Sequence, residues 1–213
     1  MKNKKIVWFI TFTILLFGFG FFFLRRPAKK LEQYTTPDTE SSRFVLRQTE
    51  GKTRVFVGEK NEKGVKQALR VVKGDAAFLI RMVGGNLVTS KVSTDGLETI
   101  FPEVRTGTDL QYNLDKTKVT QTLIINSNQA DASFSFIINL GNTTYDLTTD
   151  KSKYVFKQIG GDKLLEIPTT AKVISEGSQW WQSSAIPVVI IRHEDNSNEM
   201  LLKINPDLIY KSG

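Results

Sequence analysis

Residues 101–140, which read FPEVRTGTDLQYNLDKTKVTQTLIINSNQADASFSFIINL, decide the fold. Within residues 134–140, large apolar side chains alternate with mostly polar ones, and residues 119–125 repeat this pattern with Gln121 as a polar interruption. Successive side chains of a strand point to opposite faces of a sheet, so a period of two residues indicates a half-buried β-strand. Both segments are therefore predicted to be strands.

The same kind of pattern extends outward through residues 43–213. Residues 54–57 and 77–83 are also predicted strands, and no long window shows the 3.6-residue period of a helix. Turn-forming residues separate the strands: Glu50-Gly51-Lys52, Gly84-Gly85-Asn86, Asp95-Gly96, Asp115-Lys116, Gly141-Asn142, Gly160-Gly161 and Asp195-Asn196-Ser197-Asn198. The prediction is an all-β fold, an antiparallel β-sandwich region of one large or two small sandwiches. If there are two, we expect the seam near residues 99–103.

A different pattern occupies residues 6–24, IVWFITFTILLFGFGFFFL, which contain seven phenylalanines and no charged residue. As an α-helix this segment would be about 28 Å long, close to the thickness of the hydrocarbon core of a bilayer. We therefore expect a single N-terminal transmembrane helix that acts as an uncleaved signal anchor. Trp8 is expected at one membrane interface, and Arg25 and Arg26 at the other.

Two other interpretations of residues 6–24 fit less well. A cleaved signal peptide would need small residues before its cleavage site, whereas residues 20–30 read GFFFLRRPAKK. A buried core helix would seldom be so uniformly apolar or carry bases at both of its ends. An uncleaved signal anchor accounts both for the missing cleavage site and for the uniformly apolar segment with bases at its two ends.

The distribution of charge argues against a nucleic-acid partner. The chain carries 29 Lys and Arg residues against 22 Asp and Glu residues, a net charge of +7. Residues 1–30 hold seven of the bases and no acid, which leaves 22 charges of each sign in the remainder. Bases that flank an apolar segment set membrane topology or attract lipid headgroups. The absence of Cys further excludes a disulfide scaffold, a Cys-ligated metal site and a thiol nucleophile.

These observations predict four regions along the chain. A basic tail (1–5) precedes the transmembrane signal anchor (6–24), a Pro- and Thr-containing juxtamembrane linker (25–42) and an extracytoplasmic β-sandwich region (43–213). The bases on the two sides of the anchor nearly balance. We place the N-terminus in the cytoplasm because a short basic tail followed by an apolar core resembles an export signal.

Residues 98–213 resemble a module from the β-rich region of bacterial wall-associated and YD-repeat (rearrangement-hotspot) surface proteins. In that family a short strand leads into a Gly-x-Asp-aliphatic-x-Tyr step, and a two-stranded unit follows. The matching residues are Val104, Gly107, Asp109, Leu110 and Tyr112, the strands at 119–125 and 134–140, and, toward the C-terminus, Ile167, Pro168, Pro206 and Asp207. The resemblance implies a surface-displayed β-module and brings no active site with it.

The chain departs from the pattern of that family in two places. Lys118-Val119-Thr120-Gln121 stands where a Lys-Glu pair usually enters the first long strand, and Ser175-Glu176-Gly177 replaces an Asp-x-x-Gly turn. YD repeats and a toxin domain are also missing from the sequence.

Two groups of residues are candidates for a defined role. Gly107, Asp109 and Tyr112 are expected to form a structural turn, since glycine adopts positive φ and a carboxylate can cap a turn. No D-x-D-x-D loop surrounds Asp109, so no metal site is predicted. Trp180 and Trp181 are the candidate ligand-binding residues. Neighbours on a strand face opposite sides, so one ring is expected outside the core, where it could stack on a sugar or a partner.

No catalytic residue is predicted. His193 is the single histidine and no Gly-x-Ser-x-Gly motif is present, so the chain lacks an evident nucleophile–base pair. The expected function is a noncatalytic, surface-displayed module for adhesion, scaffolding or envelope assembly. Its expected partners are the lipid bilayer and a cell-envelope glycan or another surface protein, with no cofactor. The alternatives are a carbohydrate-binding module that uses an exposed Trp, and an envelope polymer hydrolase that uses paired carboxylates.

Overall fold

The computed structural model describes residues 8–15, 43–127, 130–131, 133–176, 181–195 and 197–203, with the backbone alone for 8–15, 173–176 and 181–184. Apart from a 3₁₀ position at Arg43, all regular structure in this part of the chain is β. The strands are β1 (Trp8–Leu15), β2 (Phe44–Glu50), β3 (Thr53–Asn61), β4 (Gly64–Lys73), β5 (Ala76–Met82), β6 (Lys91–Val92), β7 (Glu98–Arg105), β8 (Thr108–Asp115), β9 (Lys118–Ile125), β10 (Ser133–Gly141), β11 (Thr143–Leu147), β12 (Lys153–Gln158), β13 (Lys163–Pro168), β14 (Thr170–Glu176), β15 (Trp181–Arg192) and β16 (Asn198–Lys203).

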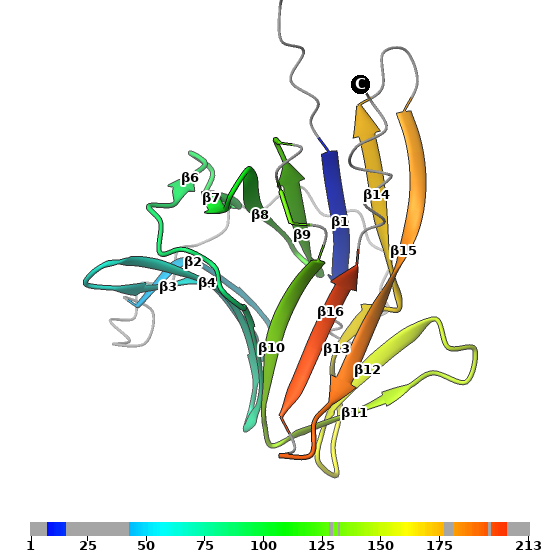
Figure 1. Cartoon of the computed structure of the whole chain (residues 1–213). Helices are drawn as coiled ribbons and strands as arrows, with labels where there is room; N and C mark the ends of the chain where they lie inside the picture. Colours follow the sequence, from blue (N-terminus) through cyan, green and yellow to red (C-terminus); the bar gives the residue numbers. More distant parts are fainter. Residues whose placement is uncertain are drawn as a thin grey trace, which may run out of the picture.

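Every strand pairing is antiparallel, and the strands form two sheets that share β15 (Figure 1). One sheet has the order β2-β3-β4-β5-β10-β16-β15. The other has the order β15-β14-β1-β9-β8-β7-β6, and a β11-β12-β13 extension joins it at β1. The prediction of an all-β, antiparallel, sandwich-like fold is confirmed.

Strand β15 passes from one sheet to the other near its middle. Pro187 is opposite Thr170 of β14, and the next residue, Val188, is opposite Leu202 of β16. Strands that change sheets make the corners of such folds, and proline suits this place because it lacks the N–H that a central strand would need. The two sheets are therefore covalently continuous through a single long strand.

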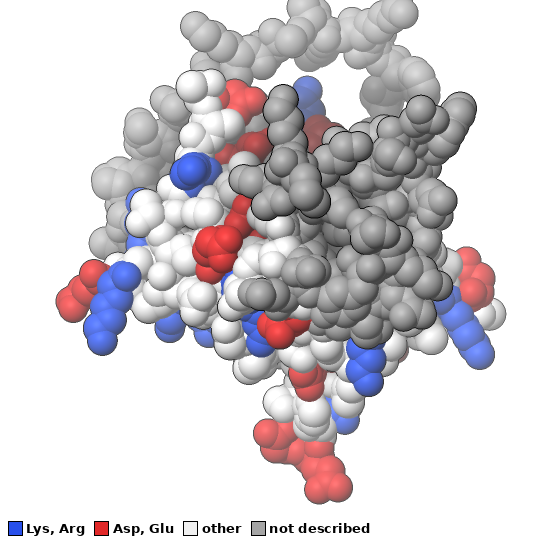
Figure 2. Space-filling model, turned by 45° about the horizontal axis from the view of Figure 1, so that its top comes forward, with Lys and Arg blue, Asp and Glu red and all other residues white. Residues whose placement is uncertain are grey.

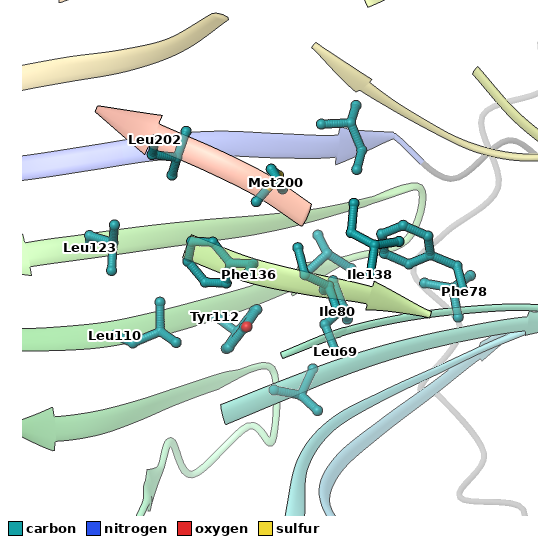
Figure 3. Packing of buried hydrophobic residues seen from close by; sticks show 14 of the residues in the cluster. Leu69, Phe78, Ile80, Leu110, Tyr112, Leu123, Phe136, Ile138, Met200 and Leu202 are labelled. Atoms are coloured by element: carbon teal, nitrogen blue, oxygen red, sulfur yellow. The ribbon is translucent and has the colours of Figure 1, made fainter. Parts of the chain in front are cut away.

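A shared core lies between the two sheets. Leu69 of β4 and Phe136 of β10, from one sheet, face Leu110 and Tyr112 of β8 and Leu123 of β9 from the other (Figure 3). All five side chains are at most 1% exposed. Each stabilises the fold by about 1.5–3 kcal/mol relative to an exposed position. The cluster draws on strands before and after residues 99–103, and those residues themselves lie within β7.

Strands β3 and β4 carry apolar residues on both of their faces. Phe44, Phe56 and Val72 form a second, smaller cluster, in which the two phenylalanine rings lie 5.0 Å apart. This packing explains why residues 55–58 are buried without interruption, where a one-sided strand would alternate.

The transmembrane helix predicted over 6–24 stays a prediction, because the structure describes only residues 8–15 of this segment. They form strand β1, whereas the sequence predicts a transmembrane helix over 6–24. Trp, Phe, Ile and Thr favour strands, and β1 finds hydrogen-bonding edges on both sides, at β9 and at β14. The rest of the predicted anchor, and the linker with Arg25 and Arg26, lie outside the described residues. No helix in the described ranges is long and apolar enough to cross a membrane.

Gly58 is needed where β3 bulges against the other sheet. The pairing of β3 with β4 shifts register between Val57 and Glu59, and Gly58 has a φ of +71°. A Cβ atom added there would lie 2.8 Å from Cζ of Phe101 and 2.9 Å from Cγ2 of Val45. A side chain at this position would therefore face both backbone strain and a clash with the core.

We predict that Gly58→Ala lowers the free energy of unfolding by about 2–4 kcal/mol, because positive φ and overpacking add. Gly51→Ala is the matched control, since Gly51 has a φ of +57° with nothing within 4 Å of the added Cβ. It should cost about 1–2 kcal/mol. Chemical denaturation of the purified full chain measures both losses. Equal losses would contradict the close contact at Phe101.

Candidate functional site

The turn between β7 and β8 holds two of the three predicted turn residues. Gly107 has a φ of +63°, and a Cβ atom added there would collide with Ser127. Asp109 Oδ1 accepts a hydrogen bond from the Glu103 backbone N–H (2.7 Å), and its Oδ2 accepts one from Asn126 Nδ2 (2.9 Å). The Asp109 carboxylate thus ties β7 to the end of β9. Its oxygens are directed at protein donors.

Tyr112 lies in the interior, three residues after Asp109 on β8. Its ring meets that of Phe101 edge-on at 6.0 Å, and burial raises the pKa of its hydroxyl well above the ordinary value. In the register of the sheet, Tyr112 stands opposite Thr99 of β7 on one side and Gln121 of β9 on the other. Its position is that of a core side chain.

The remaining candidates are placed only in part. Trp180 lies outside the described residues. Trp181 begins β15, where its backbone is opposite Glu176 of β14, and its side chain is not described. Trp8 begins β1 and is opposite Ile125 of β9 and Ser175 of β14. A binding role for Trp180 or Trp181 stays a prediction.

An open hollow lies beside the β11–β12 hairpin and β13. Glu166 at its edge binds Lys153 Nζ (3.2 Å) and Lys163 Nζ (3.0 Å), while Asp146 pairs with Lys157 (3.4 Å). Burial of the Glu166 carboxyl would raise its pKa, but hydrogen bonds from Lys163 and Lys153 outweigh this effect, so the pKa lies below its usual range.

Asp150 lies at the turn that borders the same hollow. It accepts hydrogen bonds from the Thr148 hydroxyl (2.6 Å) and from the Ser152 backbone N–H (3.0 Å) and hydroxyl. These bonds, with that from Thr148 the largest, lower the pKa of Asp150 to about 2. A glycosidase needs one carboxyl with a raised pKa to act as the general acid. The pKa values of the Glu166 and Asp150 carboxyls are shifted in the opposite direction.

Asp150 belongs to a turn chemistry that recurs in this fold. Asp95 accepts hydrogen bonds from Ser93 and from the Leu97 N–H, and Asp195 accepts them from the Ser197 hydroxyl and N–H. In each case the hydroxyl is the largest cause of a lowered pKa. The sequence predicts turns at Asp95 and Asp195 but not at Asp150, and the aspartate–hydroxyl pairing was not predicted at any of the three; its signal is Ser or Thr two residues from Asp.

Gln121 is a buried polar residue next to β1. It is 1% exposed, and neither its Nε2 nor its Oε1 has a hydrogen-bond partner in the described structure. Its neighbours on the same face of β9 are Val119, Leu123 and Ile125, all at most 1% exposed. The break in alternation at Gln121 was visible in the sequence, but its unpaired state was not.

Other features of the described residues do not add a catalytic set. His193 is exposed and its Nε2 lies 3.0 Å from Glu199 Oε2. No group of three His, Cys, Asp or Glu side chains that could hold a metal ion occurs among the described residues. Figure 2 shows Lys and Arg side chains interspersed with Asp and Glu on the visible described surface, without a broad region of one sign.

Comparison with family models, with curated proteins and with solved structures finds no match to this chain.

We predict that Thr148→Val raises the pKa of Asp150 from about 2 toward its ordinary value of 3.8, because the largest stabilising hydrogen bond to the carboxylate is removed. The lowered pKa contributes stability above about pH 4 that is lost as the pH falls toward 2. Between about pH 4 and pH 2 the free energy of unfolding of Thr148→Val should therefore fall less than that of the wild-type protein.

The measurement is an NMR titration of the Asp150 carboxyl carbon. Thr149→Val is the matched control, because Thr149 is exposed and is not among the groups that shift Asp150. An unchanged midpoint in Thr148→Val would contradict the assignment of the hydroxyl.

Proposed function

We propose that this chain is a membrane-anchored, noncatalytic β-module that is displayed on the outer side of a bacterial cell membrane and serves adhesion, scaffolding or envelope assembly. The observation that carries the proposal is the segment 6–24, which has no charge over 19 residues and is flanked by the seven excess bases of the chain. A helix of this length and composition matches a bilayer.

The properties of the β-region support a binding or structural role. Together with the acidic linker residues its charges balance over residues 31–213, its visible described surface mixes both signs, and the carboxylates of the hollow beside β13 are already bound by lysines or hydroxyls. Such a surface suits contact with neutral glycan or protein rather than with polyanions. The resemblance of residues 98–213 to wall-associated and YD-repeat surface proteins points the same way.

We expect the full chain to remain in the membrane pellet after alkaline extraction of cell membranes. The double variant Leu16→Arg/Phe17→Arg should move at least tenfold more protein into the supernatant, because each arginine near the bilayer centre costs about 2.5–3.5 kcal/mol. Both substitutions lie outside β1, so they leave the strand residues unchanged.

The matched control is Thr35→Arg/Thr36→Arg, which adds the same charge to the linker and should leave retention unchanged. A C-terminal tag that is digested by protease added to spheroplasts reports the outward orientation. Wild-type protein in the alkaline supernatant would exclude the anchor, and a protected tag would exclude the orientation.

A further inference from the structure

The strand position between β9 and β14 is completed by a segment from the far N-terminus. Strand β1 runs antiparallel to both neighbours, with residues 8–15 opposite residues 118–125 of β9 and residues 8–11 opposite residues 172–175 of β14 (Figure 1). The other neighbours of β9 and β14 are β8 and β15. An extended segment at this position pairs backbone groups on two edges at once, which makes it a favourable site for strand addition.

Residues 8–15 cannot be in the sheet and in the bilayer at the same time. This inference rests on the proposed function, in which residues 6–24 span the membrane. In the anchored protein the edges of β9 and β14 are then open to a strand from elsewhere.

The chemistry of that strand is indicated by Gln121. Its Cα partner on β1 is Phe12, whose side chain has no hydrogen-bonding group. Residues directly opposite each other in an antiparallel pair have neighbouring side chains, and on β8 the residue opposite Gln121 is Tyr112. Neither polar atom of the Gln121 side chain is paired there, so the β1 side is the position from which a polar residue could pair it. Leaving that amide unpaired costs free energy, and a strand with an amide or hydroxyl at this position would remove the cost.

We propose that the position between β9 and β14 is an acceptor site for a strand of another protein. The partner strand has about eight residues and runs antiparallel to both β9 and β14. It is uncharged and carries apolar residues at alternate positions. It carries Asn, Gln, Ser or Thr opposite Gln121. A second copy of this chain is a poor donor, because its residues 8–15 present Phe12 at that position and lie in the bilayer when anchored.

The binding test uses the full chain in nanodiscs and two fluorescent peptides. Both peptides contain the sequence of residues 8–15 between lysine pairs for solubility, and one of them carries Phe12→Gln. Anisotropy, corrected with empty nanodiscs, should show that the Phe12→Gln peptide binds at least tenfold more tightly. Gln121→Leu in the protein should reverse this preference, since the unpaired amide is then gone.

Gln111→Leu is the matched control for that reversal. Gln111 lies on β8 next to Tyr112 and therefore on the opposite face of the strand, away from the core. The variant should keep the preference of the wild-type protein for the Phe12→Gln peptide.

The absence of cysteine from the chain gives a second readout. Thr11 and Thr122 are opposite each other in the β1–β9 register, at a spacing that suits a disulfide. The double variant Thr11→Cys/Thr122→Cys should form no disulfide under mild oxidation in nanodiscs. If the disulfide forms, the chain's own segment holds the site and the proposal is wrong.

The outcomes separate this inference from the proposed function. If neither peptide binds to protein that resists alkaline extraction, the acceptor site is excluded and the anchor stands. If neither binds and the protein is extracted, both fail. Equal binding of the two peptides would overturn the assignment of a polar residue opposite Gln121.

Discussion

The structure depends on how backbone N–H and C=O groups at the edges of its strands are paired. An antiparallel sheet satisfies these groups only while each strand has a neighbour, and an unpaired edge attracts other strands. Strand β15 pairs the edges of both β14 and β16, because it leaves one sheet at Pro187 and joins the other at Val188. At the junction of β9 and β14 this pairing is supplied by β1, whose residues come from the most apolar part of the chain.

This constraint links the fold to the proposed location of the protein. Residues 8–15 form a strand between two partners, and in the proposed anchor their backbone would instead bond internally, as a helix in lipid. Trp, Phe, Ile and Thr are compatible with both, since they are apolar enough for lipid and favour strands in a sheet.

The polar features of the fold are mainly local and structural. The Asp109 carboxylate bridges β7 and β9, and the Glu166 carboxylate joins two lysines from neighbouring parts of the sheet. Asp95, Asp150 and Asp195 use hydroxyls and backbone N–H groups at turns. Gln121 is different, because its buried amide has no partner among the described residues, and it lies opposite Phe12 of β1.

Side-chain alternation and turn chemistry act over a few residues, so the sequence alone predicts the β-class of the fold, the strands at 119–125 and 134–140, and the turn at Asp115-Lys116 before the first of them. It also located the apolar segment and the charge asymmetry around it. The burial of β3 and β4 on both faces, the role of β15 in two sheets and the position of β1 between β9 and β14 are visible in the three-dimensional structure alone. Those features arise from contacts between residues far apart in the chain, and alternation reports whether a residue is buried but not which strand lies beside it.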